Sequence, residues 1–202
     1  MGGTGRELVR QALELGHEVT AFARHARALG IAHERLHIIE GDALRRVSVD
    51  AAIEGQSAVL SALGTRSLFK HITLFSQSTE CIVGSMERQG VQRLIVESSL
   101  GVGDSRGQLG LLGTWIAVPV FLARIYADKE RQESIIARSQ LDWTIVRPAM
   151  LTNGPQRGNY RTWSGAAPKA RASRISRADV AHFMLSILGK IETYRRAINC
   201  SY

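Results

Sequence analysis

The sequence predicts an α/β fold built on a doubly wound, mostly parallel sheet. Three observations support this prediction: strand-like and helix-like segments alternate, a glycine-rich turn leads straight into the first helix, and the strand-like runs end in small or polar residues. A hydrophobic fraction of 45% and a charged fraction of 22% are ordinary for a globular protein and exclude a disordered chain. Because the sequence has neither an internal repeat nor a long linker, residues 1–202 are expected to form a single domain.

The first elements are defined by apolar spacing and turn residues. Residues 4–15 place apolar side chains on one face of a helix, and Gly16 follows the last of them. Residues 18–23 and 36–39 are short runs rich in apolar and β-branched side chains, which predict strands. The chain is therefore expected to begin with a helix and two strands.

The middle of the chain continues the alternation. Residues 49–54 predict a short helix, and residues 58–63 predict a strand. A long helix is expected over residues 74–89 and ends at Gly90, a residue typical of helix C-termini. Residues 93–96 then predict another strand.

The last part of the chain completes the pattern. A helix is expected over residues 121–139, and a strand is expected over residues 143–146. The final helix is expected over residues 177–188, with Asp179 in its first turn, where a carboxylate interacts favourably with the helix dipole. Residues 197–200 predict the final strand.

Small and polar residues follow the predicted strands. In an open parallel sheet, ligands bind beyond the carboxyl ends of the strands, so chemistry is expected at these positions. They are Arg24, Gly41-Asp42, Gly64-Thr65-Arg66, Ser98-Ser99 and Arg147-Pro148.

The net charge of +8 is unevenly distributed. Residues 143–178 contain no acidic side chain and carry a series of arginines and a lysine. This stretch is either a surface for a polyanion, such as nucleic acid or an anionic membrane, or a solvated basic loop region. We favour the second interpretation and expect no nucleic-acid binding, because the sequence contains no known nucleic-acid module.

Residues 108–123 form an uncharged, apolar run. It is too short for a confident membrane span and Pro119 interrupts it, so a buried or lid-like segment over an apolar ligand is expected, with peripheral membrane contact as the alternative. The two cysteines, Cys81 and Cys200, do not predict a disulfide framework or a metal site. Since no signal-peptide pattern is present either, a cytoplasmic protein without a membrane span is expected, and the sequence slightly favours a monomer.

The glycine-rich turn at Gly2, Gly3, Thr4 and Gly5 predicts a dinucleotide site. Glycines let the backbone approach a pyrophosphate, and the following helix N-terminus supplies free N–H groups and the positive end of a dipole. A hydrophobic strand normally precedes such a turn, and here only Met1 does. The chain is therefore expected to lack the opening strand of this fold.

The residues that follow the predicted strand at residues 18–23 indicate which dinucleotide is bound. An NAD site usually has an acidic residue at this spacing for the 2′-hydroxyl, whereas a basic residue accommodates the 2′-phosphate of NADP. Here Arg24 and Arg27 are present, and no acid appears before Glu34. The sequence therefore favours NADP(H) over NAD(H), although a solvated strand-end charge is the alternative for Arg24.

Two further strand ends are candidate parts of the same site. Asp42 either accepts a hydrogen bond from the adenine amino group or is a turn residue, and the two interpretations stay open. The Gly64-Thr65-Arg66 segment is expected beside the nearer ribose and the pyrophosphate, where Arg66 can bind a phosphate through two hydrogen bonds.

Taken together, these motifs resemble the atypical short-chain dehydrogenase/reductase superfamily. Within it they are similar to the NAD(P)H-binding, NmrA-like branch that includes biliverdin reductase B/flavin reductase. The matching stretches are GGTGRELVRQALELGHEVTAFAR, HIIEGDA, AVLSALGTRS, RLIVESS, LDWTIVRPAMLTNGP and ISRADVAHFML, in the order of the family. The resemblance implies a Rossmann-like fold, NADP(H) binding, and reduction of flavins, quinones or similar planar substrates.

The resemblance also implies roles for individual residues. Gly2, Gly3, Thr4 and Gly5 match the phosphate turn, Arg24 the reader of the 2′-phosphate, Asp42 with Ala43 the adenine contact, and Leu63, Gly64, Thr65 and Arg66 the ribose-side loop. Ser98 and Ser99 match the strand end beside the nicotinamide, Lys129 a contact to the cofactor ribose, and Pro148 and Met150 the loop beside the nicotinamide.

The chain departs from the family pattern in three ways. It is N-terminally truncated relative to the family, because the opening strand and the first part of the glycine turn are not in the sequence. Tyr126 lies three residues before Lys129, which is not the Tyr-x-x-x-Lys register of ordinary short-chain dehydrogenases. A histidine of the active-site loop in the biliverdin reductase B group is replaced by Met150.

The catalytic candidates are Ser99, Lys129 and Tyr126. Ser99 is expected to bond beside the nicotinamide, Lys129 to anchor the ribose and lower a neighbouring pKa, and Tyr126 to be a weak candidate acid. The alternatives are that Ser99 is only a small strand-end residue and that Tyr126 is a core or rim aromatic. Because no strong general acid is evident, acceptors whose reduced form takes its proton from water are favoured.

The sequence thus predicts an NADPH-dependent oxidoreductase that reduces a planar acceptor such as a flavin or a quinone. Two alternatives stay open. One is a non-catalytic NADP(H)-sensing or scaffold protein of the NmrA-like type. The other is an impaired, truncated paralogue, or a reading frame whose start codon is misassigned.

Overall fold

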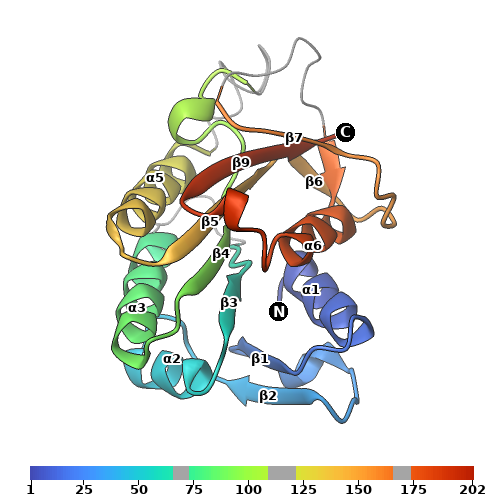
Figure 1. The fold of residues 1–202 in the computed structure, drawn as a ribbon, viewed down its shortest axis with the longest axis vertical. Coiled ribbons are helices and arrows are strands. Elements are labelled where there is room, and N and C mark those ends of the chain that lie inside the picture. The colour runs from blue at the N-terminus through green and yellow to red at the C-terminus, as the bar shows by residue number, and fades with distance from the viewer. Residues whose placement is uncertain (66–72, 109–121, 166–173) are drawn as a thin grey trace.

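The computed structural model describes residues 1–65, 73–108, 122–165 and 174–202 (Figure 1). Its α-helices are α1 (Gly3–Glu14), α2 (Arg46–Ile53), α3 (Leu74–Gln89), α5 (Ala123–Arg138) and α6 (Arg177–Ser186). Its strands are β1 (Val19–Ala23), β2 (Leu36–Glu40), β3 (Ala58–Ser61), β4 (Arg93–Glu97), β5 (Asp142–Pro148), β6 (Met150–Thr152), β7 (Arg161–Trp163), β8 (Arg174–Ser176) and β9 (Arg196–Ser201). Short 3₁₀ turns are η1 (Arg27–Leu29), η2 (Gly103–Ser105) and η4 (Ile191–Thr193).

The described strands form three sheets. The largest has the order β3-β4-β5-β9-β7, and its pairs are parallel except for β7 with β9. Strands β1 and β2 pair in parallel with each other, and so do β6 and β8. The predicted α/β class with a mostly parallel sheet is therefore confirmed.

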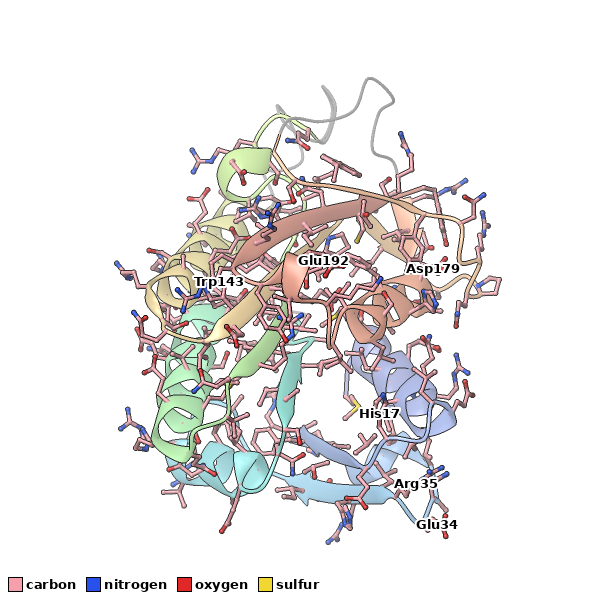
Figure 2. The ribbon with its side chains drawn as sticks, in the orientation of Figure 1. His17, Glu34, Arg35, Trp143, Asp179 and Glu192 are labelled. Atoms are coloured by element: carbon pink, nitrogen blue, oxygen red, sulfur yellow. The ribbon has the colours of Figure 1, made fainter. Side chains whose placement is uncertain are left out.

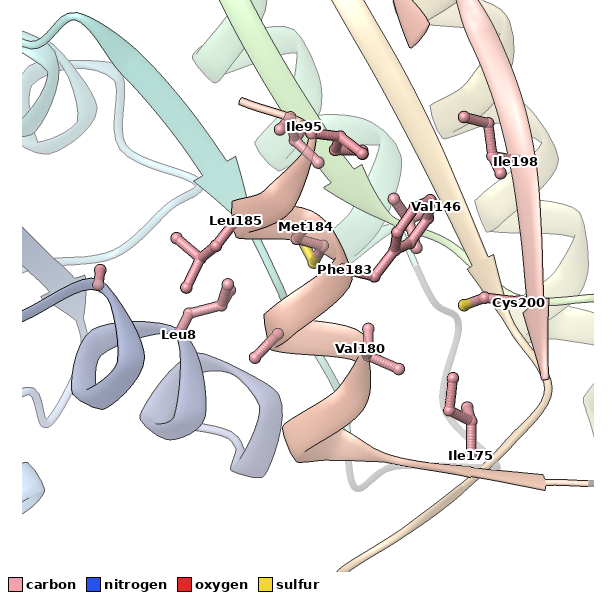
Figure 3. Packing of buried hydrophobic residues seen from close by; sticks show 13 residues of the cluster. Leu8, Ile95, Val146, Ile175, Val180, Phe183, Met184, Leu185, Ile198 and Cys200 are labelled. Atoms are coloured by element: carbon pink, nitrogen blue, oxygen red, sulfur yellow. The ribbon is translucent and has the colours of Figure 1, made fainter. Parts of the chain in front are cut away.

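Helices cover both faces of the large sheet. Helices α1 and α6 pack against each other on one face, and α2, α3 and α5 lie on the other (Figure 1). Successive side chains of a strand point to opposite faces, so Ile95 and Val146 pack towards α1 and α6 (Figure 3), whereas Leu94 and Ile145 pack towards α3 and α5. Every residue of β4 is buried, as expected for a central strand with both faces covered.

Strands β1 and β3 are not paired with each other by backbone hydrogen bonds in the described chain. The side-chain amide of Gln56, two residues before β3, donates to the Thr20 hydroxyl of β1 over 3.1 Å. The glycine turn lies at the end of β3, because a Cβ added to Gly2 would stand 3.9 Å from the Ala62 carbonyl oxygen. That the chain lacks an opening strand stays a prediction.

The structure differs from the sequence prediction mainly in the C-terminal part. Strands β6, β7 and β8 fall in the stretch expected to be a basic loop region. Each is three residues long, which is too short for a period-two pattern to be visible. Most of the uncharged run, residues 109–121, lies outside the described residues, as does Arg66.

Candidate cofactor site

The N-terminus of α1 presents backbone N–H groups without a side-chain cap. Its N-cap residue, Gly2, provides no side-chain cap, and the first helical bond runs from the Arg6 N–H to the Gly2 carbonyl over 3.0 Å. The N–H groups of the first turn therefore have no acceptor inside the helix. A Cβ added to Gly64, at the end of the neighbouring β3, would meet nothing within 4 Å. These features fit a dinucleotide pyrophosphate.

Most of the candidate residues follow parallel strands of the large sheet. Arg24 follows β1, Leu63, Gly64 and Thr65 follow β3, and Ser98 and Ser99 follow β4. Pro148 is the last residue of β5. The carboxyl ends of β3, β4 and β5 lie at the same edge of one parallel sheet, so residues 63–65, 98–99 and 148 lie at that edge, whereas Arg24 follows a strand of the separate β1-β2 sheet.

Arg24 and Arg27 differ in how they are held. Arg24 is exposed and forms no ion pair with any residue that the structure describes. The backbone N–H of Arg27 donates to Glu40 over 3.1 Å, and its side chain reaches the same carboxylate at 4.0 Å. The acidic residue at this edge, Glu40, comes from β2 and is paired with Arg27, which leaves Arg24 available for an anionic group.

Asp42 forms a local turn. Its carboxylate accepts a hydrogen bond from the Leu44 N–H over 3.0 Å, and its carbonyl accepts from the Arg45 N–H over 2.9 Å. This is the geometry of an Asx turn. Asp42 and Ala43 are both partly exposed, so the adenine contact stays a prediction beside the turn role.

The two serines after β4 point to different surroundings. The Ser98 hydroxyl donates to the Glu133 carboxylate of α5 over 2.6 Å and is buried. The Ser99 side chain is partly exposed, and its hydroxyl has no hydrogen-bond partner in the described chain. Of the two, Ser99 is the hydroxyl left free to contact a ligand.

Lys129 is a buried ammonium below the strand ends. Its Nζ donates to the Glu97 carbonyl over 3.4 Å and lies 4.4 Å from the centre of the Phe75 ring. Burial lowers the pKa of Lys129 to about 8, although the carboxylates of Glu97, Glu133 and Asp128 oppose this effect. The group can therefore exchange a proton near neutral pH.

Tyr126, one helical turn earlier, is already engaged. Its hydroxyl donates to the Leu100 carbonyl over 2.9 Å. Burial raises the pKa of Tyr126 to about 12. In this structure the tyrosine orders the loop after β4, and its role as an acid stays a prediction.

Two residues of this region were missed by the sequence analysis. Glu97 ends β4 and is buried, and its carboxylate accepts a hydrogen bond from the Thr4 hydroxyl over 3.2 Å. Arg177 lies against Gly3, and a Cβ there would be 2.5 Å from its Cδ atom. The position of Glu97 directly before Ser98-Ser99 was a usable signal, whereas nothing local in the sequence connects Arg177 with the glycine turn.

The loop after β5 is the remaining predicted part of the site. Met150 begins β6 and is 65% exposed, while Pro148 is buried and its carbonyl accepts from the Leu100 N–H over 2.9 Å. Strand β8 pairs with β6 and leads into α6. Asp179 in the first turn of α6 accepts from the Arg157 and Gly158 N–H groups at 2.9 and 2.8 Å, which fixes the neighbouring loop (Figure 2).

Across residues 1–65, 73–108, 122–165 and 174–202, no group of three or more His, Cys, Asp or Glu side chains is placed to hold a metal ion. None of the helices in these ranges is both long and apolar enough to cross a membrane.

Comparison with known proteins establishes the family. The sequence profile of the NAD(P)H-binding family matches residues 1–190. The chain belongs to the NAD(P)H-binding family. An uncharacterised chloroplastic protein of Arabidopsis thaliana is 30% identical to it over 167 residues, which cover 78% of this chain and 59% of the plant protein. The chain therefore spans less than two thirds of that relative, and a cytoplasmic location stays a prediction.

Solved structures of low sequence identity share the fold of this NAD(P)H-binding protein. A short-chain dehydrogenase/reductase from Veillonella parvula, in complex with NADP, has a TM-score of 0.83 at 21% identity, covering 100% of this chain and 90% of that one. ChuY, an anaerobillin reductase from Escherichia coli O157:H7, has a TM-score of 0.80 at 23% identity, covering 100% and 92%. The predicted Rossmann-like fold is thus confirmed, and the family match over residues 1–190 confirms the NAD(P)H-binding part of the resemblance.

Proposed function

We propose that this protein binds NADP(H) in preference to NAD(H) and reduces a small planar acceptor such as a flavin or a quinone. The observation that carries the proposal is Arg24, a cation without an ion-pair partner in the described chain, at the end of the strand that follows α1. A basic residue there accommodates a 2′-phosphate. The acid that would favour a 2′-hydroxyl, Glu40, is engaged with Arg27.

The chain's own residues would bind and orient the cofactor. The N–H groups of the first turn of α1 would bind the pyrophosphate, together with the positive end of the helix dipole. Lys129 would hold the ribose, and the free Ser99 hydroxyl would contact the nicotinamide end. When bound, NADPH supplies the hydride, and the protein supplies orientation and exclusion of competing reactions.

The proposed class of acceptor follows from the proton donors at the site. The Tyr126 hydroxyl is bonded to a carbonyl and its pKa is raised to about 12, so it is a poor acid in this arrangement. Lys129 is a candidate donor near neutral pH, but it is buried beneath the strand ends. Flavins and quinones suit such a site, because their reduced forms can take a proton from water.

The test is binding followed by turnover. Dissociation constants for NADPH and NADH are measured by cofactor fluorescence, and oxidation of NADPH is then followed with flavin mononucleotide and a soluble benzoquinone as acceptors. Tighter binding of NADPH than NADH, with turnover of either acceptor, is the expected result. Binding without turnover would favour the sensing or scaffold alternative, and equal affinity for the two cofactors would contradict the NADP(H) preference.

A further inference from the structure

Glu97 is a carboxylate buried in the interior of the molecule. It ends the central strand β4 and is 6% exposed. Burying a carboxylate is unfavourable unless positive charge or hydrogen bonds compensate for it. The groups that compensate come from three separate elements, and each of these elements carries part of the candidate cofactor site.

The first element is the glycine turn. Thr4 lies in the first turn of α1, and its hydroxyl donates to the Glu97 carboxylate over 3.2 Å. The other two elements contribute positive charge. Burial raises the pKa of Glu97, and this rise is opposed by Lys129 on α5, whose Nζ donates to the Glu97 backbone carbonyl over 3.4 Å, and by Arg177 on α6. Arg177 in turn lies against Gly3 of the same turn.

Two other carboxylates, Glu133 and Asp128, lie near Lys129, but both accept hydrogen bonds from other residues. Glu133 accepts from the Ser98 hydroxyl at 2.6 Å and from two nitrogens of Arg147 at 3.0 and 2.6 Å. Asp128 accepts from the Phe75 N–H at 2.8 Å and the Ser76 hydroxyl at 2.5 Å. Within the described residues, Glu97 has only the Thr4 hydroxyl as a donor. Of the three carboxylates near Lys129, Glu97 therefore has the fewest hydrogen-bond donors in the described chain.

We propose that Glu97 is a positioning residue that joins the first turn of α1, through the Thr4 hydroxyl on its carboxylate, to the Lys129 ammonium on its backbone carbonyl, so that the pyrophosphate end and the ribose end of the cofactor site keep one geometry. The inference rests on the proposed function, because it assumes that these two ends hold a dinucleotide. Glu97 acts through Thr4 and Lys129 and needs no contact with the cofactor.

Glu97→Gln tests this, since glutamine keeps the size of the side chain and can still accept from Thr4. Glu130→Gln is the matched control, because Glu130 is next to Lys129 in sequence but pairs with Arg106 at the surface. NADPH binding is expected to weaken about tenfold in Glu97→Gln and to stay unchanged in Glu130→Gln. Glu97→Asp is expected to restore part of the affinity.

A second measurement is independent of the cofactor. Side-chain NMR of isotopically labelled lysine resolves few groups, because the lysines are Lys70, Lys129, Lys169 and Lys190, and Lys129→Met identifies the signal of interest. The Lys129 titration midpoint, about pH 8 in the parent, is expected to move to lower pH in Glu97→Gln, because the ammonium loses a neighbouring negative charge. Thr4→Val is expected to weaken NADPH binding without moving this midpoint.

The outcomes separate the two proposals. A parent protein that binds no NADPH would overturn the proposed function and the positioning role with it, while the lysine titration would still report whether Glu97 acts on Lys129. If the parent binds NADPH but Glu97→Gln, folded by circular dichroism, binds it within twofold of the parent, the positioning role is wrong. An unchanged Lys129 midpoint in Glu97→Gln would also overturn it.

Discussion

The Arg177 side chain lies directly against Gly3: a Cβ built on Gly3 would stand 2.5 Å from Cδ and 3.0 Å from Nε of Arg177. Gly3 begins α1 and Arg177 begins α6, so a guanidinium meets the turn that is proposed to bind the pyrophosphate. Its Nη1 donates to the side-chain oxygen of Asn153 over 2.6 Å. Because that acceptor is neutral, a phosphate would be a stronger partner for the same guanidinium.

Arg177→Ala is expected to weaken NADPH and NADH binding to the same extent, by about tenfold, because both cofactors contain the pyrophosphate. Fluorescence titration with each cofactor checks this. Arg174→Ala removes an equal charge from the exposed start of β8 and should leave both constants unchanged. A loss confined to NADPH would show that Arg177 contacts the 2′-phosphate instead.

Gly3→Ala should disturb the contact between Gly3 and the Arg177 side chain. The added methyl group forces the Arg177 side chain to move, and NADPH affinity is expected to fall. In an Arg177→Ala background, Gly3→Ala should lower NADPH affinity by a smaller factor, since the clashing side chain is gone. A double-mutant cycle on NADPH affinity measures the difference, and strictly additive effects would mean that the two residues act independently.

Arg24→Ala is expected to weaken NADPH binding by about ten- to a hundredfold and to leave NADH binding unchanged, because NADH carries a hydroxyl where NADPH carries the phosphate. Arg27→Ala should have a smaller effect, since Arg27 is held by Glu40. Arg88→Ala, on the exposed side of α3, controls for the lost charge. An equal loss for both cofactors in Arg24→Ala would contradict the NADP(H) preference.

NADPH binding is expected to weaken as pH rises through about 8. Burial lowers the pKa of Lys129 to about 8, so its positive charge is present below that pH and is lost above it. Dissociation constants for NADPH should rise with pH in the parent when they are measured between about pH 6.5 and 9.5, a range that brackets the lysine pKa. In Lys129→Met the NADPH dissociation constant should not change with pH over the same range. If the dissociation constant of the parent does not rise with pH, the ammonium has no role in binding.

Asp179→Ala is expected to destabilise the fold by about 1–3 kcal/mol, because it leaves the buried Ser176 hydroxyl and three partly buried donors without their acceptor. Burial raises the pKa of Asp179, but hydrogen bonds from Tyr202, Gly158, Arg157 and Ser176 outweigh this and hold it below the usual value. The stabilisation is therefore present above the ordinary carboxyl pKa and is lost as pH falls through the lowered value.

Urea unfolding at pH 7 and at pH 3 measures this contribution. The difference between the parent and Asp179→Ala should shrink at the lower pH. Glu192→Gln, on the exposed turn η4, is the control and should change the unfolding free energy little at either pH (Figure 2). A difference that does not depend on pH would show that the ionised form of Asp179 is not what stabilises the loop.

Local sequence patterns were sufficient for most of the secondary structure. The helix at α3 was predicted with the observed bounds, since Gly90 takes the left-handed conformation at its end with φ of 73°. The predicted strand at residues 93–96 is β4, extended by Glu97. The three-residue strands β6 and β8 were missed, because they are stabilised by pairing with each other and not by their own composition.

The candidate site was predictable to the extent that strand ends reveal it. Ser99 follows β4 at the edge where the carboxyl ends of β3, β4 and β5 meet, because parallel topology brings these ends together whatever the side chains are. Arg24 follows β1, as the sequence predicts, but this strand belongs to the separate β1-β2 sheet. Whether a candidate hydroxyl is already hydrogen-bonded within the protein was not predictable from the sequence. Ser98 and Tyr126 are candidates of the same kind as Ser99 in the sequence, yet their hydroxyls bond to Glu133 and to the Leu100 carbonyl.

Apolar spacing and turn residues along the chain specify the alternation of strands and helices and the residues at each strand end, because these depend on neighbours a few positions apart. The pairing of Thr4 with Glu97, 93 positions away, depends on how α1 and β4 meet in space. The contact of Gly3 with Arg177 likewise exists only because α1 packs on α6. Such contacts join distant segments through packing, so the charge around the glycine turn is a property of the assembled fold.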